Sequence, residues 1–109
     1  MITIPERDWK LLRSIKDRAL NEVCSRILDA VEKIAQKKDG REHETYLELW
    51  KLLRKQDDLI ALMFNDFKRS TAVLKLAVWQ QQGLVAESEL ALFTDETRER
   101  VKRINEDIL

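Results

Sequence analysis

Few side chains in this 109-residue sequence have the types and spacing that chemistry requires. Cys24 is the only cysteine and His43 is the only histidine. A catalytic thiol needs a base close to it, and nothing in the pattern places His43 beside Cys24. A zinc site made from cysteine and histidine would find only these two ligands in one chain, whereas structural zinc takes four. The sequence therefore predicts no catalytic residue, and we interpret Cys24 as a small apolar side chain on a helix.

One cluster does combine metal-binding residue types at helical spacing, namely Asp39, His43 and Glu44. Three such residues where a helix starts are more typical of a solvated first turn, and a di-iron helical bundle would need two Glu-x-x-His motifs. The two glycines, Gly40 and Gly83, are too few for a phosphate-binding loop, and the sequence has no P-loop, Rossmann or nucleophile-elbow motif. We therefore expect no metal ion, no nucleotide and no other cofactor.

Charge in the sequence is abundant but balanced, with 20 basic and 20 acidic residues. Because proteins that bind nucleic acids usually carry a basic excess, this balance argues against a nucleic-acid partner. A helix-turn-helix can be drawn over residues 74–93, but its second helix would carry two acidic residues and no Lys or Arg to meet a phosphate backbone. We therefore predict a protein that does not bind DNA or RNA.

Cysteine content and hydropathy indicate the compartment. A single cysteine cannot form an internal disulfide bond, which is typical of proteins in a reducing cytoplasm. Residues 1–6 lack the basic and then apolar pattern of a secretory signal. The longest apolar run covers residues 59–64, far short of the ~20 residues that a membrane-spanning helix needs. The sequence thus predicts a cytoplasmic protein without a membrane partner.

Two long helical segments must carry whatever function the chain has. The first is predicted for residues 5–38, where apolar side chains recur every three or four positions and form one continuous face. Thr3 and Glu6 have the spacing of a capping box at the start of this helix. Asp39 and Gly40 are expected to end it, because glycine adopts a left-handed backbone without strain.

The second helical segment is predicted for residues 42–82, which contain neither glycine nor proline. From Tyr46 to Ala77 its seam residues alternate in steps of three and four, a pattern typical of a helix that packs against other helices. Asn65 and Asp66 are the best candidates for a break, because both residue types favour helix ends and bends. The pattern leaves open whether the segment is one helix or two helices that break near Asn65.

The C-terminal region predicts two shorter helices. A short helix begins either at Ser88 or already at Ala86 and ends at Phe93. A charged last helix follows over residues 95–107, with Thr94 as its N-cap and acidic residues in its first turn. This last helix has only a narrow apolar stripe, so it should pack at the periphery.

Together these segments predict an all-α fold: an antiparallel helical bundle of about four to five helices, with two long N-terminal helical segments, in a single domain over residues 1–109. Two antiparallel helices cannot cover the wide apolar surface of the second segment. The rest would be covered by the C-terminal helices, by a fold-back at Asn65, or by a second copy of the chain. That excess favours a homodimer or another protein partner. The dimer interface would contain Trp50, Leu53, Ile60, Met63 and Phe67.

Polar residues interrupt the apolar seam of the second segment. Gln56 and Ser70 occupy seam positions, and Asp66 and Arg69 lie near Ser70 in the sequence. One interpretation is a ligand pocket inside the bundle, formed by these four residues. The interpretation that we favour is that a polar seam residue fixes how the helices align. We therefore expect a non-enzymatic helical module for protein–protein interaction or oligomerisation; the alternative is a small-molecule-binding bundle that uses this pocket.

Two short segments of the sequence resemble segments of other proteins. Residues 6–10 (ERDWK) and 64–70 (FNDFKRS) resemble segments of small, all-helical, uncharacterised proteins of bacteria. The resemblance extends over most of the chain, although its motifs are not specific. It implies a bacterial cytoplasmic protein, and it assigns no activity, cofactor or site residue.

Overall fold

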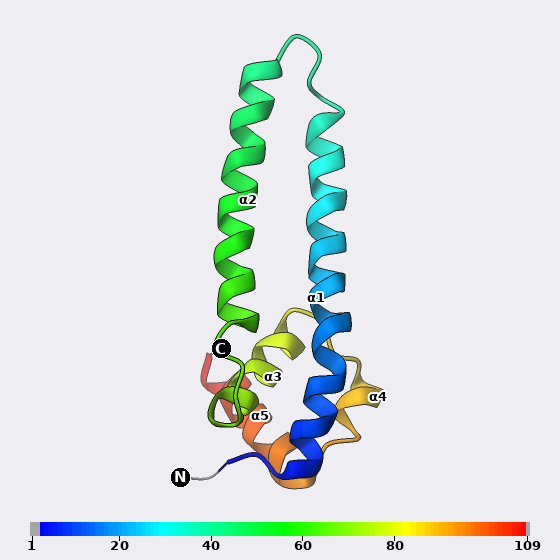
Figure 1. Cartoon of the computed structure of the whole chain (residues 1–109), viewed down its shortest axis with the longest axis vertical. Coiled ribbons are helices and arrows are strands. Elements are labelled where there is room, and N and C mark those ends of the chain that lie inside the picture. Colours follow the sequence, from blue (N-terminus) through cyan, green and yellow to red (C-terminus); the bar gives the residue numbers. More distant parts are fainter. Residues whose placement is uncertain (1–2, 109) are drawn as a thin grey trace.

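The computed structural model describes residues 3–108 and confirms an all-α fold (Figure 1). Within these residues there is no β-strand. The same residues form five α-helices and one 3-10 helix: α1 (Glu6–Ala35), α2 (Glu42–Phe64), η1 (Arg69–Thr71), α3 (Ala72–Gln81), α4 (Glu87–Leu90) and α5 (Asp95–Ile108).

The fold has two parts, and α1 belongs to both. α1 and α2 run antiparallel as a long hairpin, which confirms the predicted pairing of the two long helices (Figure 1). The shorter helices α3, α4 and α5 gather around the N-terminal half of α1. We call this end of the molecule the base, and we call the projecting part of the hairpin, residues 24–60, the arm. The molecule measures 55 × 24 × 23 Å, and the hairpin accounts for its length.

The start of α1 differs from the prediction, because Thr3 and Glu6 do not form a capping box. Pro5 is the N-cap residue, and within the described residues no side chain caps the helix. The carbonyl of Pro5 accepts a 2.9 Å hydrogen bond from the amide of Trp9. The Glu6 carboxylate instead pairs with the guanidinium of Arg69, which is 63 positions away in the sequence. Glu6 therefore forms an ion pair with a residue distant in the sequence, and not the capping contact that its local spacing predicted.

The turn between the long helices begins earlier than predicted. α1 ends at Ala35 rather than at residue 38, and α2 begins at Glu42. Gly40 has φ +77°, the left-handed conformation that glycine adopts without a steric penalty. Gly40 lies in the turn that follows, where the Arg41 amide donates a 2.8 Å hydrogen bond to the Lys38 carbonyl. The prediction that Asp39 and Gly40 end the first helix is therefore wrong, because the helix already ends at Ala35 with Gln36 as its C-cap residue.

The second helical segment breaks at Asn65, so the alternative of two helices is correct. α2 ends at Phe64, and Asn65 is extended, with φ −76° and ψ 159°. Asp66 then adopts φ +54°, a conformation that Asp tolerates better than most residues other than glycine. Its carbonyl accepts a 2.7 Å hydrogen bond from the Thr71 hydroxyl. This turn reverses the chain and directs α3 against α1 and α5.

Side chains of α3 cover the C-terminal end of α2. Lys75 Nζ donates a 2.6 Å hydrogen bond to the carbonyl of Leu62, and Trp79 Nε1 donates a 3.0 Å hydrogen bond to the carbonyl of Met63. The last carbonyls of a helix lack partners within the helix and carry a partial negative charge. These contacts satisfy the end of α2 and explain why the Lys75 side chain is buried in the base.

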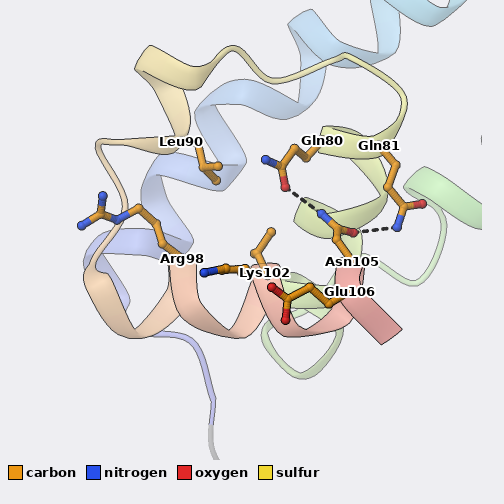
Figure 2. A pocket seen from close by; sticks show the side chains of 8 residues that line it. Gln80, Gln81, Leu90, Arg98, Lys102, Asn105 and Glu106 are labelled. Carbon is orange, nitrogen blue, oxygen red and sulfur yellow. Dashed lines mark hydrogen bonds between the residues drawn. The ribbon is translucent and has the colours of Figure 1, made fainter. Parts of the chain in front are cut away.

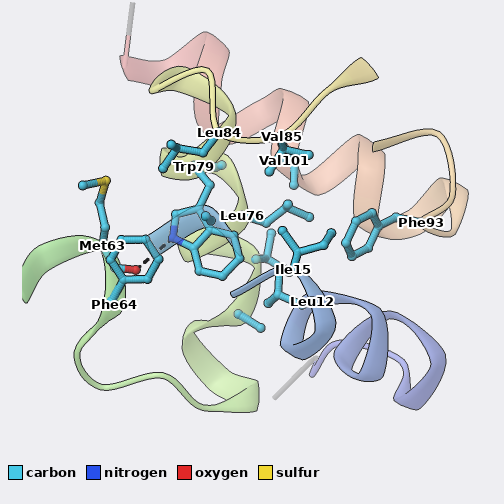
Figure 3. Close-up of a cluster of buried hydrophobic side chains, with 14 of the residues drawn as sticks. Leu12, Ile15, Met63, Phe64, Leu76, Trp79, Leu84, Val85, Phe93 and Val101 are labelled. Atoms are coloured by element: carbon cyan, nitrogen blue, oxygen red, sulfur yellow. Dashed lines mark hydrogen bonds between the residues drawn. The ribbon is translucent and has the colours of Figure 1, made fainter. Parts of the chain in front are cut away.

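The hydrophobic core lies in the base, with Trp79 at its centre (Figure 3). The Trp79 ring is fully buried and stacks on Phe64 and Phe67, with ring centroids 5.4 and 5.8 Å away. Among the described residues of α1, buried positions end at Val23. In the arm, Ile27, Leu59 and Ile60 still pack against this core but are only partly buried. The other members of the core are Ile4, Leu12, Ile15, Ala19, Met63, Ala72, Val73, Leu76, Ala77, Leu84, Val85, Phe93 and Val101.

Arginines of α1 hold the segment that follows α3. They donate to main-chain carbonyls: Arg7 to Leu92 at 3.2 Å, Arg18 to Leu84 at 3.1 Å, and Arg26 to Gln82 and Gly83 at 2.6 and 3.1 Å. Arg18 also forms a salt bridge of 2.7 Å with Glu89 of α4. α4 begins at Glu87, which agrees with the earlier of the two predicted starts. The loops around α4 are therefore fixed along α1.

A buried carboxylate joins the first helix to the last. Asp8 is fully buried and accepts hydrogen bonds from the Thr94 amide (3.1 Å), the Thr94 hydroxyl (2.6 Å) and the Thr97 hydroxyl (2.5 Å). Thr94 directly precedes α5, and its hydroxyl accepts from the Thr97 amide at 3.4 Å, as predicted for an N-cap. Asp8 thus fixes the N-terminus of α5 against the first turn of α1.

Candidate functional site

The arm presents large apolar side chains to the outside. Leu28 is 60% exposed, Trp50 is 52% exposed and Leu53 is 47% exposed. Trp50 Nε1 donates a 2.8 Å hydrogen bond to the hydroxyl of Tyr46, one turn earlier on the same face of α2. The only polar group of the indole is thereby satisfied within the chain, so the rest of the ring offers apolar surface for contact.

These side chains border a shallow depression between α1 and α2, which we call the arm groove. It has a volume of about 410 Å³ and is lined by Cys24, Ile27, Leu28, Trp50, Leu53, Arg54, Gln56, Asp57 and Ile60. Six of these nine residues are apolar, counting Cys24. Ile27 and Ile60 of the groove are partly buried and pack against the core, whereas Leu28, Trp50 and Leu53 are exposed.

Two opposite charges, Arg54 and Asp57, stand together on the α2 side of the arm groove. Both side chains are exposed, and within residues 3–108 neither has a salt-bridge partner. Arg41, near the tip of the arm, shows the contrast, because it pairs with Glu44 at 2.9 Å and Glu48 at 3.3 Å. The hydrogen bond to Glu44 is the main cause that raises the pKa of Arg41 above its usual value. The arm groove thus carries a cation and an anion that remain available to a partner.

Cys24 and His43, which were considered for catalysis and metal binding, lie in different parts of the structure. Cys24 is half-buried and lines the arm groove, whereas His43 is exposed in the first turn of α2. Among residues 3–108, no group of three or more His, Cys, Asp and Glu side chains is arranged to hold a metal ion. None of the helices in this part of the chain has the length and hydropathy to cross a membrane.

The structure brings together three of the four residues of the predicted ligand pocket. Asp66, Arg69 and Ser70 are exposed in the turn between α2 and α3, where Asp66 pairs with Lys68 at 3.3 Å and Arg69 pairs with Glu6. Gln56 lies about two turns before the end of α2. It is half-buried between α1 and α2 and lines the arm groove.

The predicted interface residues divide between the arm and the base. Trp50, Leu53 and Ile60 line the arm groove. Met63 is buried in the core. Phe67 packs on the ring of Trp9 at a centroid distance of 5.0 Å and on Trp79. These last two predicted residues are therefore covered by the chain itself, because the fold-back at Asn65 places them inside the base.

A second concave surface lies between α3 and α5, and sequence reasoning did not find it (Figure 2). This α3–α5 groove has a volume of about 730 Å³ and is lined by Gln80, Gln81, Leu90, Arg98, Val101, Lys102, Asn105 and Glu106. The Asn105 amide bridges two glutamines, accepting from Gln81 Nε2 at 2.6 Å and donating to Gln80 Oε1 at 2.7 Å. No periodic signal connects residues 80–81 with residues 98–106, since only the packing of α3 on α5 brings them together.

The contents of the two grooves indicate what each can bind. The arm groove offers mainly apolar surface with one guanidinium and one carboxylate, which suits the side chains of another polypeptide. The α3–α5 groove offers amide groups, charged groups of both signs and the apolar side chains of Leu90 and Val101. No protein-family model matches the chain, and none of the curated proteins or solved structures compared with it is similar to it.

Proposed function

We propose that this chain is a non-enzymatic helical module for protein–protein interaction, and that it forms a homodimer through the arm groove. The observation that carries the proposal is the apolar surface of Leu28, Trp50 and Leu53 beyond the core. In a sequence with 37% charged residues, a contiguous exposed apolar patch is typical of an interaction site. Tryptophan is also among the residues that contribute most to binding at interfaces.

The partner that the groove favours is a second copy of this chain. A two-fold interface presents the same surface patch from both subunits, so each charge must find its complement on an identical patch. A patch that carries one cation and one anion, here Arg54 and Asp57, is self-complementary, whereas a patch of one sign would repel its copy. Two helical hairpins also pair readily into a four-helix bundle, in which both apolar faces are covered.

The setting that we propose is the cytoplasm of a bacterium. The single cysteine supports a reducing compartment. The resemblance of residues 6–10 and 64–70 to small bacterial proteins supports the source. Neither argument depends on the arm groove, so the dimer and the setting stand or fall separately.

Sedimentation velocity from low to high micromolar concentration tests the dimer. The wild-type chain should dimerise, and Trp50→Glu should remain monomeric because it places a charge in the apolar groove. Leu92→Glu is the matched control, since Leu92 is 53% exposed but does not line the groove, and it should dimerise like the wild type. A wild-type chain that stays monomeric at the highest concentration, or a Trp50→Glu chain that dimerises as tightly, contradicts the proposal.

A second candidate function, small-molecule binding, is supported by the α3–α5 groove rather than by the residues that the sequence suggested. Its volume of about 730 Å³ is within the range of ligand pockets, about 300–1,000 Å³. The cation Lys102 and the apolar side chains of Leu90 and Val101 favour an anion with an apolar body, whereas Arg98 pairs with Asp95 and Glu106 adds one carboxylate to the lining. Titration with sodium decanoate, followed by amide NMR, should then shift the signals of Val101 and Asn105. Unchanged signals at saturating decanoate would end this candidate and leave the dimer untouched.

A further inference from the structure

We infer that the two arms pair antiparallel, about a two-fold axis that crosses α2 between Arg54 and Asp57. This inference rests on the proposed dimer and adds its geometry. It names the contact between charges that fixes the alignment, namely Arg54 of each chain against the partner's Asp57.

The order of side chains along α2 carries the inference. Trp50, Arg54, Asp57 and Ile60 follow each other in steps of three and four, so they form one stripe on the helix. All four line the arm groove. From Trp50 to Ile60 the stripe is about 15 Å long, at 1.5 Å per residue. It therefore reads apolar, positive, negative and apolar along the helix.

When the partner's α2 runs in the opposite direction, its stripe is complementary to the stripe of the first chain. In an antiparallel pair, Arg54 lies opposite the partner's Asp57, and Trp50 lies opposite the partner's Ile60. The two-fold axis repeats both contacts, so two ion pairs form at the centre of the stripe and each indole covers an apolar residue. Every member of the stripe then meets a side chain of matching character.

A parallel pair gives the opposite result. With the axis along the arms, Arg54 would lie against the partner's Arg54 and Asp57 against the partner's Asp57. Like charges in direct opposition at an interface are unfavourable and select against that arrangement. Within residues 3–108 neither charge has a salt bridge that would need to be broken, so both are free to make the antiparallel contacts.

Charge reversal on the full chain tests the geometry. Arg54→Glu and Asp57→Lys should each weaken dimerisation by about 10-fold in Kd, because either change turns two attractive contacts into two repulsive ones. The chain that carries both changes should recover the affinity of the wild type, since the introduced glutamate of each copy would then face the introduced lysine of the other. An equimolar mixture of the two single variants should likewise form a dimer tighter than either variant forms alone.

The matched control reverses a neighbouring pair with the same signs and spacing. Lys55 and Asp58 are exposed and lie outside the arm groove, so Lys55→Glu and Asp58→Lys should leave Kd within about twofold. Circular dichroism of all variants, recorded below the dimerisation range, separates a loss of fold from a loss of contact. Because all four substituted positions are exposed, every variant is expected to retain the helical signal.

The outcomes separate the proposed dimer from its proposed antiparallel geometry. Single variants that dimerise like the wild type, or a double variant that fails to recover affinity while remaining folded, overturn the antiparallel geometry but leave the dimer in place. A wild-type chain that is monomeric throughout overturns both. Rescue by the double variant, with an unaffected control pair, supports both.

Discussion

Asp8 and Thr97 lie 89 positions apart in the sequence, yet the Thr97 hydroxyl donates a 2.5 Å hydrogen bond to the Asp8 carboxylate inside the base. Both side chains are fully buried. Thr94 donates two more hydrogen bonds to the same carboxylate. The anion also lies beside the N-terminus of α5, where the helix dipole favours negative charge. The carboxylate therefore contributes both hydrogen bonds and favourable electrostatics to the attachment of the last helix.

Asp8→Asn should lower the free energy of unfolding by about 2 kcal/mol. The amide nitrogen of asparagine cannot accept a hydrogen bond, so at least one donor of Thr94 or Thr97 would be left unpaired in a buried site. Urea denaturation followed by circular dichroism measures the change. Asp17→Asn is the control, because Asp17 is exposed on the same helix, and it should change stability by less than about 0.5 kcal/mol. Equal stabilities for the two variants would contradict this role of Asp8.

Lys75→Met should lower the free energy of unfolding by about 1.5 kcal/mol, because it leaves the Leu62 carbonyl at the end of α2 without its charged donor. The methionine side chain keeps most of the volume of the lysine stem, so the packing of α3 should change little. Lys51→Met, at an exposed position of α2, provides the comparison. Guanidinium denaturation of both variants checks the result, and an unchanged or increased stability for Lys75→Met would show that the cap is not needed.

Gly40→Ala should destabilise the turn between the long helices by about 1 kcal/mol. The cause is the backbone alone: φ is +77°, and a Cβ added at Gly40 would meet no atom within 4 Å. Gly40→Asn should cost less, since asparagine adopts the left-handed conformation more readily. Thermal denaturation of the two variants tests this order. A loss in Gly40→Asn as large as that in Gly40→Ala would contradict the explanation from backbone conformation.

Amide hydrogen exchange should divide α1 near Val23. Amides of residues 10–23 are expected to exchange only through global unfolding, because their helix face is held in the core. Amides of residues 28–34 should exchange through a local opening of lower free energy, because the arm makes fewer buried contacts. The experiment uses Trp50→Glu, so that dimerisation does not protect the arm. Uniform protection along α1 would contradict a division between arm and base.

Much of the fold was predictable from local pattern. The steps of three and four defined the long helices, Asn65 marked the break, and Thr94 marked the start of α5, because each of these signals acts within a few residues. The prediction of a capping box at Glu6 was wrong because the contact that forms there is not local. Its partner, Arg69, is 63 positions away, and no local signal indicates such a pair.

The candidate site was predictable only in part. Apolar periodicity identified Trp50, Leu53 and Ile60, which line the arm groove. It also selected Met63 and Phe67, since a seam residue looks the same whether its own chain or another covers it. The burial of Asp8 had no signal either, because an acidic residue in the first turn of a helix ordinarily faces solvent and interacts with the helix dipole.

The core takes residues from both ends of the sequence, from Ile4 to Val101, and this has a consequence for synthesis on the ribosome. The hairpin of α1 and α2 leaves the exit tunnel first. Its core residues are then still uncovered, because the helices that pack on them follow later in the sequence. Phe64, at the end of α2, and then Trp79 emerge before α5, whose Val101 belongs to the same core cluster. Phe64 and Trp79 of the nascent polypeptide therefore stay exposed until α5 has also left the ribosome, and exposed apolar side chains of this kind favour aggregation and chaperone binding.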